Sequence, residues 1–172
     1  MRRVMLDIET MSTAPSALVL AVAYQDFDYQ QIEGEWYIAD QWRQYALEAD
    51  IDVGTQQWWK DQPAAYQAVC ALPPDGFKEV LWRLQEVCST VDEVWCWGAS
   101  FDFAVLRHWA KVFGIGTLWP YRAERCARTV CQVAGVTRQG EVAHTPLADC
   151  RQQIAAVRMA LERIHFAGEV SR

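Results

Sequence analysis

The sequence lacks the features of a zinc-ribbon, exported or membrane-spanning protein. None of its six cysteines forms a Cys-x-x-Cys pair, so the usual zinc-ribbon spacing is absent. The longest apolar runs, such as "ALVLAVAY", are far too short to span a bilayer. Asp7 and Glu9 interrupt the early apolar run in which an export signal would lie. These absences predict reduced, mostly buried thiols in a cytoplasmic protein that has no membrane partner.

The chain also lacks an excess of basic residues. Its formal net charge is −6, whereas a protein that binds duplexes non-specifically normally has a basic face. Binding to the end of a nucleic acid stays compatible with this charge, because metal ions can supply the positive charge. Tryptophan, by contrast, is abundant: nine residues in 172 indicate a large aromatic core, a stacking surface, or both.

No internal repeat, low-complexity segment or linker divides the sequence, so we expect one domain over residues 1–172. Buried strand patterns cover residues 3–9, 17–28 and 32–39, and helical patterns dominate afterwards. A strand meander followed by helices around a mixed sheet predicts an α/β domain.

Capping residues and breaks give the later elements. Thr55 is expected to cap a short helix, and Pro63 marks a break or the first turn of another helix. The buried strand "DEVWCWG" ends at Gly98 and a helix follows it. Thr145 is the expected N-cap of the last helix, and Pro146 its first residue.

The stretch "VMLDIET" places two carboxylates in the first predicted strand. Residues two apart on a strand point to the same face, so Asp7 and Glu9 project together. Two like charges this close are unfavourable unless a positive charge lies between them. Mg²⁺ and Mn²⁺ prefer oxygen ligands of this kind. The alternative is an exposed strand end at which both side chains are solvated.

Two further acidic residues lie at the starts of predicted helices. Asp102 follows the strand "VWCWG" at the start of a helix, where a carboxylate is electrostatically favourable. An ordinary aspartate at the start of a helix, without a role in a site, also fits this position. In "HTPLAD", His144 lies just outside a helix and Asp149 lies in its first turns. The imidazole can therefore lean over the spot that Asp149 faces. His108 and His165 have no acidic partner at a telling separation and are interpreted as structural.

These acidic residues and the histidine follow the order Asp-x-Glu, Asp, and then His with Asp five positions later. The order resembles the DEDDh branch of the DnaQ-like 3′–5′ exonuclease superfamily, over nearly the whole chain. The resemblance implies a ribonuclease H-like exonuclease fold, two divalent metal ions (Mg²⁺ or Mn²⁺), and hydrolysis of phosphodiester bonds at the 3′ end of single-stranded RNA or DNA. The implied products are nucleoside 5′-monophosphates. The implied metal ligands are Asp7, Glu9, Asp102 and Asp149, and the implied general base is His144.

A narrower resemblance rests on "DIETM", "GTQQWWKDQP", "WGASFDFAVLR", "RCARTV" and "AHTPLAD". These segments are similar to the mycobacterial exoribonuclease-like group, which includes bacterial and phage exonucleases and suggests a homodimer. Phe103 stands where that group would have asparagine. The candidate substrate contacts are Thr10, Met11, Trp58, Trp59, Phe101 and Phe103.

Distinct roles are expected for these candidate contacts. Aromatic rings can stack on an unpaired end without reading its sequence, and one of Trp58 and Trp59 is expected to face the substrate while the other packs in the core. Met11 is a candidate wedge between the last two bases. The resemblance suggests that the backbone of Thr10 meets the terminal sugar.

Other interpretations stay open at this point. Arg125 and Arg128 are predicted to share a helix face and to pair with surface acids rather than with phosphate. The chain could be a catalytically silent nucleic-acid-binding relative of the fold. It could also be a metal-dependent phosphatase or an internal nuclease. RNA and DNA both stay open as substrates, because the choice depends on a contact to the 2′-hydroxyl.

Overall fold

A computed structural model of the chain describes residues 1–28, 32–139 and 144–170. Within this part of the chain the strands form one six-stranded sheet, in the order β4-β3-β2-β1-β5-β6. The strands are β1 (Arg3–Thr10), β2 (Val19–Asp26), β3 (Glu33–Ile38), β4 (Pro74–Asp75), β5 (Glu93–Cys96) and β6 (Glu124–Cys126). β1, β2 and β3 pair antiparallel, and the other neighbours pair parallel. The mixed sheet begins with the predicted meander and is consistent with a ribonuclease H-like fold.

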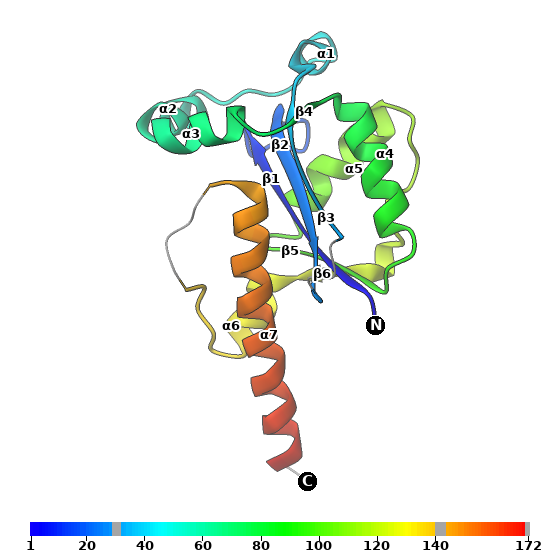
Figure 1. The fold of residues 1–172 in the computed structure, drawn as a ribbon, viewed down its shortest axis with the longest axis vertical. Helices are drawn as coiled ribbons and strands as arrows, with labels where there is room; N and C mark the ends of the chain where they lie inside the picture. The colour runs from blue at the N-terminus through cyan, green and yellow to red at the C-terminus, as the bar shows by residue number, and fades with distance from the viewer. Residues whose placement is uncertain (29–31, 140–143, 171–172) are drawn as a thin grey trace.

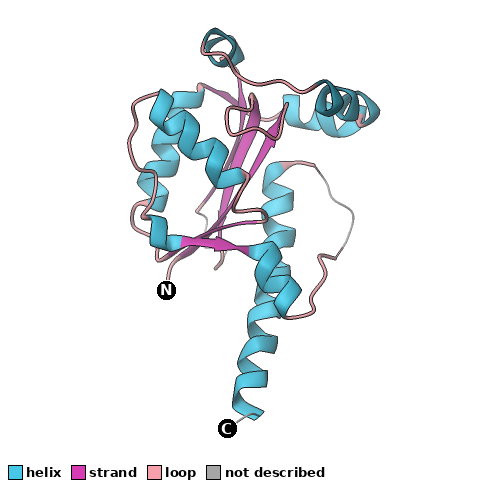
Figure 2. Ribbon diagram, turned by 180° about the vertical axis from the view of Figure 1, so that it is seen from behind, coloured by secondary structure: helices cyan, strands magenta, loops and turns pink. Residues whose placement is uncertain are grey.

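Helices cover both faces of this sheet (Figures 1 and 2). One face carries α4 (Phe77–Cys88) and α5 (Asp102–Val112), and the other carries α6 (Ala127–Val133) and α7 (Pro146–Val170). Near the carboxyl end of β1 lie α2 (Val53–Asp61) and α3 (Pro63–Cys70), while α1 (Gln41–Ala46) projects at the top of the view in Figure 1, apart from them. A 3₁₀ turn, η1 (Tyr121–Ala123), leads into β6. Among the described residues, no helix combines the length and the apolarity that crossing a membrane would need.

Successive side chains of β1 point alternately to the helix layer of α4 and α5 and to the layer of α6 and α7. Leu6 and Ile8 are buried in the core beneath α4 and α5, while Met5 is buried on the opposite side with residues of α7. Because successive strand residues point to opposite faces, Asp7 and Glu9 share the face of Met5. The two carboxylates therefore project from the middle of the sheet toward α7.

The start of α7 is tied to the sheet. Pro146 is the first helical residue, as predicted, and the carbonyl of Thr145 accepts a hydrogen bond from the Asp149 N–H at 3.0 Å. The N–H of Leu147, one of the groups without a partner inside the helix, donates to the carboxylate of Glu35 on β3 at 2.9 Å. The first turns of α7 consequently have a fixed position over the sheet.

Two local predictions are wrong. The N-cap of α2 is Asp52, whose carboxylate accepts from the Thr55 N–H at 2.7 Å, so the helix begins at Val53. Arg125 lies in β6 and not in the helix that carries Arg128. A strand of three residues is too short to show a period, and only its pairing with β5 defines it. Pro63, by contrast, is the first residue of α3, one of the two readings of that position.

Candidate active site

The first turns of α7 lie along the carboxylates of β1. Asp149 and Gln153 are four apart and share one helix face. The side-chain amide of Gln153 donates to Asp7 Oδ1 at 2.6 Å. Beside it, the Cys150 thiol lies 3.7 Å from the carbonyl oxygen of Met5. The helix and the strand thus bring together groups that are far apart in the sequence.

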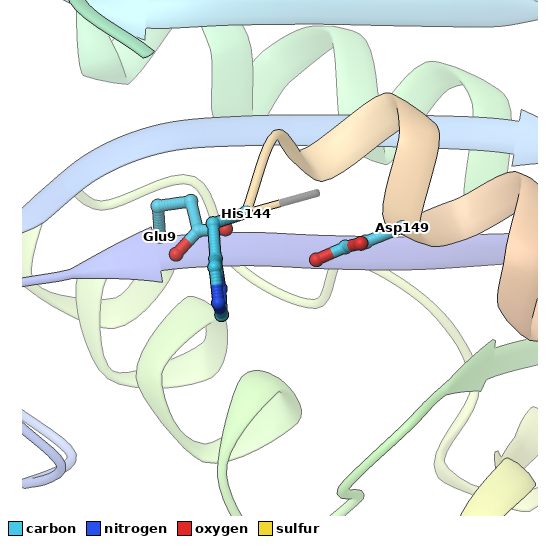
Figure 3. Close-up of side chains that lie close together, drawn as sticks. All are labelled: Glu9, His144 and Asp149. Atoms are coloured by element: carbon cyan, nitrogen blue, oxygen red, sulfur yellow. The ribbon is translucent and has the colours of Figure 1, made fainter. Parts of the chain in front are cut away.

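His144 reaches the same place from the segment before α7. The ligand atoms of Glu9, His144 and Asp149 all lie within 4.8 Å of one another, and Figure 3 shows their side chains converging above β1. His144 has a φ of 51°, in the left-handed region that residues other than glycine rarely adopt. Its ring meets Trp58 edge-on, with centroids 4.7 Å apart. This backbone turn and this ring contact together hold the imidazole over the carboxylates.

Asp102 joins them from the opposite layer. It begins α5, is almost fully buried, and accepts a hydrogen bond from the Gly98 N–H at 3.4 Å. One cleft of about 620 Å³ contains all the residues that the sequence predicted for metal binding and catalysis. These residues are Asp7, Glu9, Asp102, His144 and Asp149.

The surroundings of these carboxylates disfavour their charged forms. Burial raises the pKa of Asp7 well above its usual range, and the charges of Asp102, Glu9 and Asp149 add to the effect. Burial, together with Asp149 and Asp102, raises the pKa of Glu9 to about 8. Burial raises the pKa of Asp102 to about 6, although backbone hydrogen bonds oppose this shift. The cluster is therefore short of positive charge.

One cation already lies against the cluster, and no pattern in the sequence predicted it. The guanidinium of Arg138 forms an ion pair with Asp149 and donates to Gln152 at 3.0 Å. Arg138 comes from the segment after α6, outside any helix or strand, so no local period relates it to Asp149. It lowers the pKa of Glu9, yet that pKa stays raised overall. A single guanidinium does not balance the buried carboxylates.

The donor set suits a hard divalent cation. Carboxylate oxygens and one imidazole nitrogen converge in the cleft, and Mg²⁺ and Mn²⁺ take such ligands. The side-chain oxygen of Gln153 is buried beside Asp7 and has no hydrogen-bond partner in the described part of the chain. Glu9, His144 and Asp149 could hold one cation, and Asp7 and Asp102 line the same cleft.

One of the two tandem tryptophans lines the cleft and the other is buried in the core, as we expected from the sequence. Trp58 is 36% exposed and lines the cleft. Trp59 is 3% exposed, and its indole N–H donates to the carbonyl of Thr10 at 2.9 Å. Trp58 is therefore the ring available to a substrate, while Trp59 fastens α2 to the end of β1.

The other proposed substrate contacts differ in whether their side chains line the cleft. Phe101 lines the cleft. Stacking by Phe103 is wrong, because its side chain is fully buried against Trp119, with ring centroids 5.2 Å apart. Met11 does not line the acidic cleft but a separate pocket beside Trp59.

The hydroxyl and the carbonyl of Thr10 already form hydrogen bonds within the protein. Its hydroxyl donates to the Ser12 carbonyl at 2.6 Å, and its own carbonyl accepts from Trp59. The backbone of Thr10 was expected to meet a terminal sugar, and its carbonyl oxygen is already bonded to Trp59. Of the two arginines in "RCARTV", Arg125 pairs with Glu93 at 3.1 Å, as expected for a surface ion pair, whereas Arg128 lines the cleft.

The chain is thus an α/β domain that gathers carboxylates and a histidine at the carboxyl end of its central strand. Residues 2–161 match the family described as the 3′-5′ exoribonuclease Rv2179c-like domain. The match spans most of the chain, so the protein belongs to this family. Membership supports a hydrolytic nuclease of the exonuclease type. Comparison with curated proteins gives no match.

The raised pKa values predict how the metal-free protein responds to pH. The folded protein keeps a proton on Glu9 up to about pH 8, whereas the unfolded chain releases it near 4.5. Stability from this group is therefore complete below pH 4.5 and is lost as the pH rises through 8. With chelator present, we expect the melting temperature to fall from pH 5 to pH 8 and the Glu9→Gln variant to show a smaller fall. A wild-type melting temperature that rises over this range would contradict the electrostatic description of the cleft.

Proposed function

We propose that the protein is a metal-dependent 3′–5′ exonuclease of the DEDDh type, within the DnaQ-like superfamily. Its substrates are the 3′ ends of single-stranded RNA or DNA, and its products are nucleoside 5′-monophosphates. The observation that carries the proposal is the meeting of Asp7, Glu9, Asp102, His144 and Asp149 in one cleft. Family membership supports the same reaction class.

In this proposal the carboxylates hold two divalent ions, Mg²⁺ or Mn²⁺. When bound, such ions lower the pKa of a water molecule and stabilise the charge of a phosphoryl group and its leaving oxygen. The residues of the chain supply the rest. The buried carboxylates would fix the positions of the ions, and the partly closed cleft strengthens every charge interaction in it.

His144 is the proposed general base. An imidazole is the side chain that most often takes a proton from an attacking water in enzymes. In this role the ring nitrogen is free of metal, and it lies within 4.8 Å of oxygens of Glu9 and Asp149. The edge-on contact with Trp58 orients the ring. The same indole is exposed to the cleft, where it can stack on the terminal base.

The test is the degradation of matched RNA and DNA oligonucleotides labelled at the 5′ end. We expect a ladder of products shortened one nucleotide at a time with Mn²⁺, and none with chelator. His144→Ala should reduce turnover by about 10²–10⁴-fold, the usual contribution of a positioned general base. Asp102→Asn should abolish turnover, because it removes a charged ligand.

The matched control for the histidine is His108→Ala. His108 lies on α5 against Trp109, does not line the cleft, and should keep full turnover. Internal fragments in place of a ladder would indicate an endonuclease, and the absence of any product with either polymer would favour a catalytically silent relative. Either result would overturn the proposal.

The two tryptophans should give different losses. Trp58→Ala should weaken binding of a single-stranded oligonucleotide by about 1–3 kcal/mol, the range for stacking on one base, with little change in stability. Trp59→Ala should instead lower the free energy of unfolding by about 3–5 kcal/mol, because it empties a buried position. Fluorescence binding and urea denaturation of both variants measure these effects. Equal binding by Trp58→Ala and wild type would remove Trp58 from the substrate site.

A further inference from the structure

A second pocket continues from the acidic cleft on the side of α6. It has a volume of about 340 Å³ and shares Trp97, Arg128 and Arg138 with the cleft. Beyond that shared wall, Cys131 and Val136 are buried beneath it, and Gln132 and Thr137 are exposed at its rim. The two cavities are therefore one continuous surface with Trp97 at the junction.

The junction carries the positive charge that the acidic end of the cleft lacks. The Arg138 guanidinium lies over the Trp97 ring, 5.8 Å from its centroid, and is already paired with Asp149. Arg128 is exposed and forms no ion pair with any carboxylate in the described residues. Its backbone N–H is bonded to the Trp97 carbonyl at 3.2 Å, which fixes the start of its side chain.

Gly98 separates this free guanidinium from the carboxylates. A methyl group added at Gly98 would lie 3.6 Å from Arg128 Nη2 and 3.9 Å from Asp102 Oδ2. The absence of a side chain leaves an open surface between the two groups. An extended chain with regularly spaced phosphates can cross that surface with one phosphate at the acidic end and another beside Arg128.

We propose that the second pocket is a subsite for the nucleotide upstream of the scissile bond, with Arg128 holding its phosphate. The proposal rests on the exonuclease function and adds a substrate class, a single strand of several nucleotides rather than a dinucleotide. Grooves that bind single strands without sequence preference combine basic groups along the backbone with aromatic surfaces for bases. The arrangement of Arg128, Trp97 and Arg138 has these components, in a chain whose net charge of −6 would otherwise repel such a substrate.

The test compares binding of a dinucleotide and a hexanucleotide, both with phosphorothioate linkages that resist hydrolysis, in the presence of Mg²⁺. Arg128→Gln should weaken hexanucleotide binding by about tenfold, the loss of one hydrogen bond to a charged group. Dinucleotide binding should change less than about twofold, because a dinucleotide without a 5′-phosphate has only the scissile phosphate and offers none for Arg128 to hold. The slope of log K against log salt concentration for the hexanucleotide should become shallower by about 0.7, the value for one phosphate contact on a single strand.

A second variant tests the pocket without touching the cleft. Gln132→Glu keeps the shape of an exposed side chain that lines the second pocket alone, and its new negative charge should weaken binding of the hexanucleotide only. The matched control is Arg43→Gln, which removes the same charge from α1, where Arg43 pairs with Asp40, and should change neither ligand. Thermal melts of all variants check the fold.

The outcomes distinguish failure of the proposed subsite from failure of the proposed exonuclease function. Equal weakening of both ligands by Arg128→Gln would place Arg128 at the scissile bond and overturn the second subsite. Wild-type protein that binds both ligands equally well would overturn it too, even if the protein degrades oligonucleotides. Failure of degradation with length-dependent binding intact would overturn the exonuclease function and leave the subsite supported.

Discussion

Four carboxylates lie close together and largely out of solvent at the centre of this fold, where their charges repel one another. Asp7, Asp102 and Asp149 are almost fully buried, and Glu9 lies beside them. Burial and like charge both favour the protonated forms, so an arrangement of this kind is unfavourable at neutral pH without added positive charge. The chain itself supplies Arg138, which pairs with only one of these groups. A cluster that the protein leaves short of positive charge is physically reasonable when divalent cations complete it.

The scaffold holds the cluster in spite of this repulsion. The central strand is buried on both faces, so its backbone fixes Asp7 and Glu9. The carboxylate of Glu35 fixes the first turn of α7, and the amide of Gln153 reaches back to Asp7 at 2.6 Å. The hydrogen bond from Trp59 to the Thr10 carbonyl holds α2 at the end of β1. In this position of α2, the ring of Trp58 contacts the ring of His144. The groups that act on substrate therefore rest on elements whose positions core packing and hydrogen bonds determine.

Several parts of this site were predictable from the sequence because they depend on local periods. Asp7 and Glu9 lie two apart on β1, and His144 lies just before the helix that begins at Pro146, both as predicted. Other parts depend on contacts between distant segments. Arg138 reaches Asp149 from an irregular segment, β6 is defined by its pairing with β5, and Phe103 turns inward because Trp119 covers it. No local pattern carries such information, so sequence reasoning missed Arg138 and misplaced Phe103.

The most direct test is the number of Mn²⁺ ions that the folded protein binds without substrate, measured by calorimetry or by electron paramagnetic resonance at pH 7.5. We expect two ions per chain for wild type and weakened binding with fewer ions for Asp7→Asn, while the two proteins keep the same circular dichroism spectrum. Replacement of Asp92, an exposed acid that bonds to the backbone of Arg2, should leave binding unchanged. Absence of binding to wild type at millimolar Mn²⁺, or equal binding by Asp7→Asn, would contradict the claim that this cluster exists to hold metal.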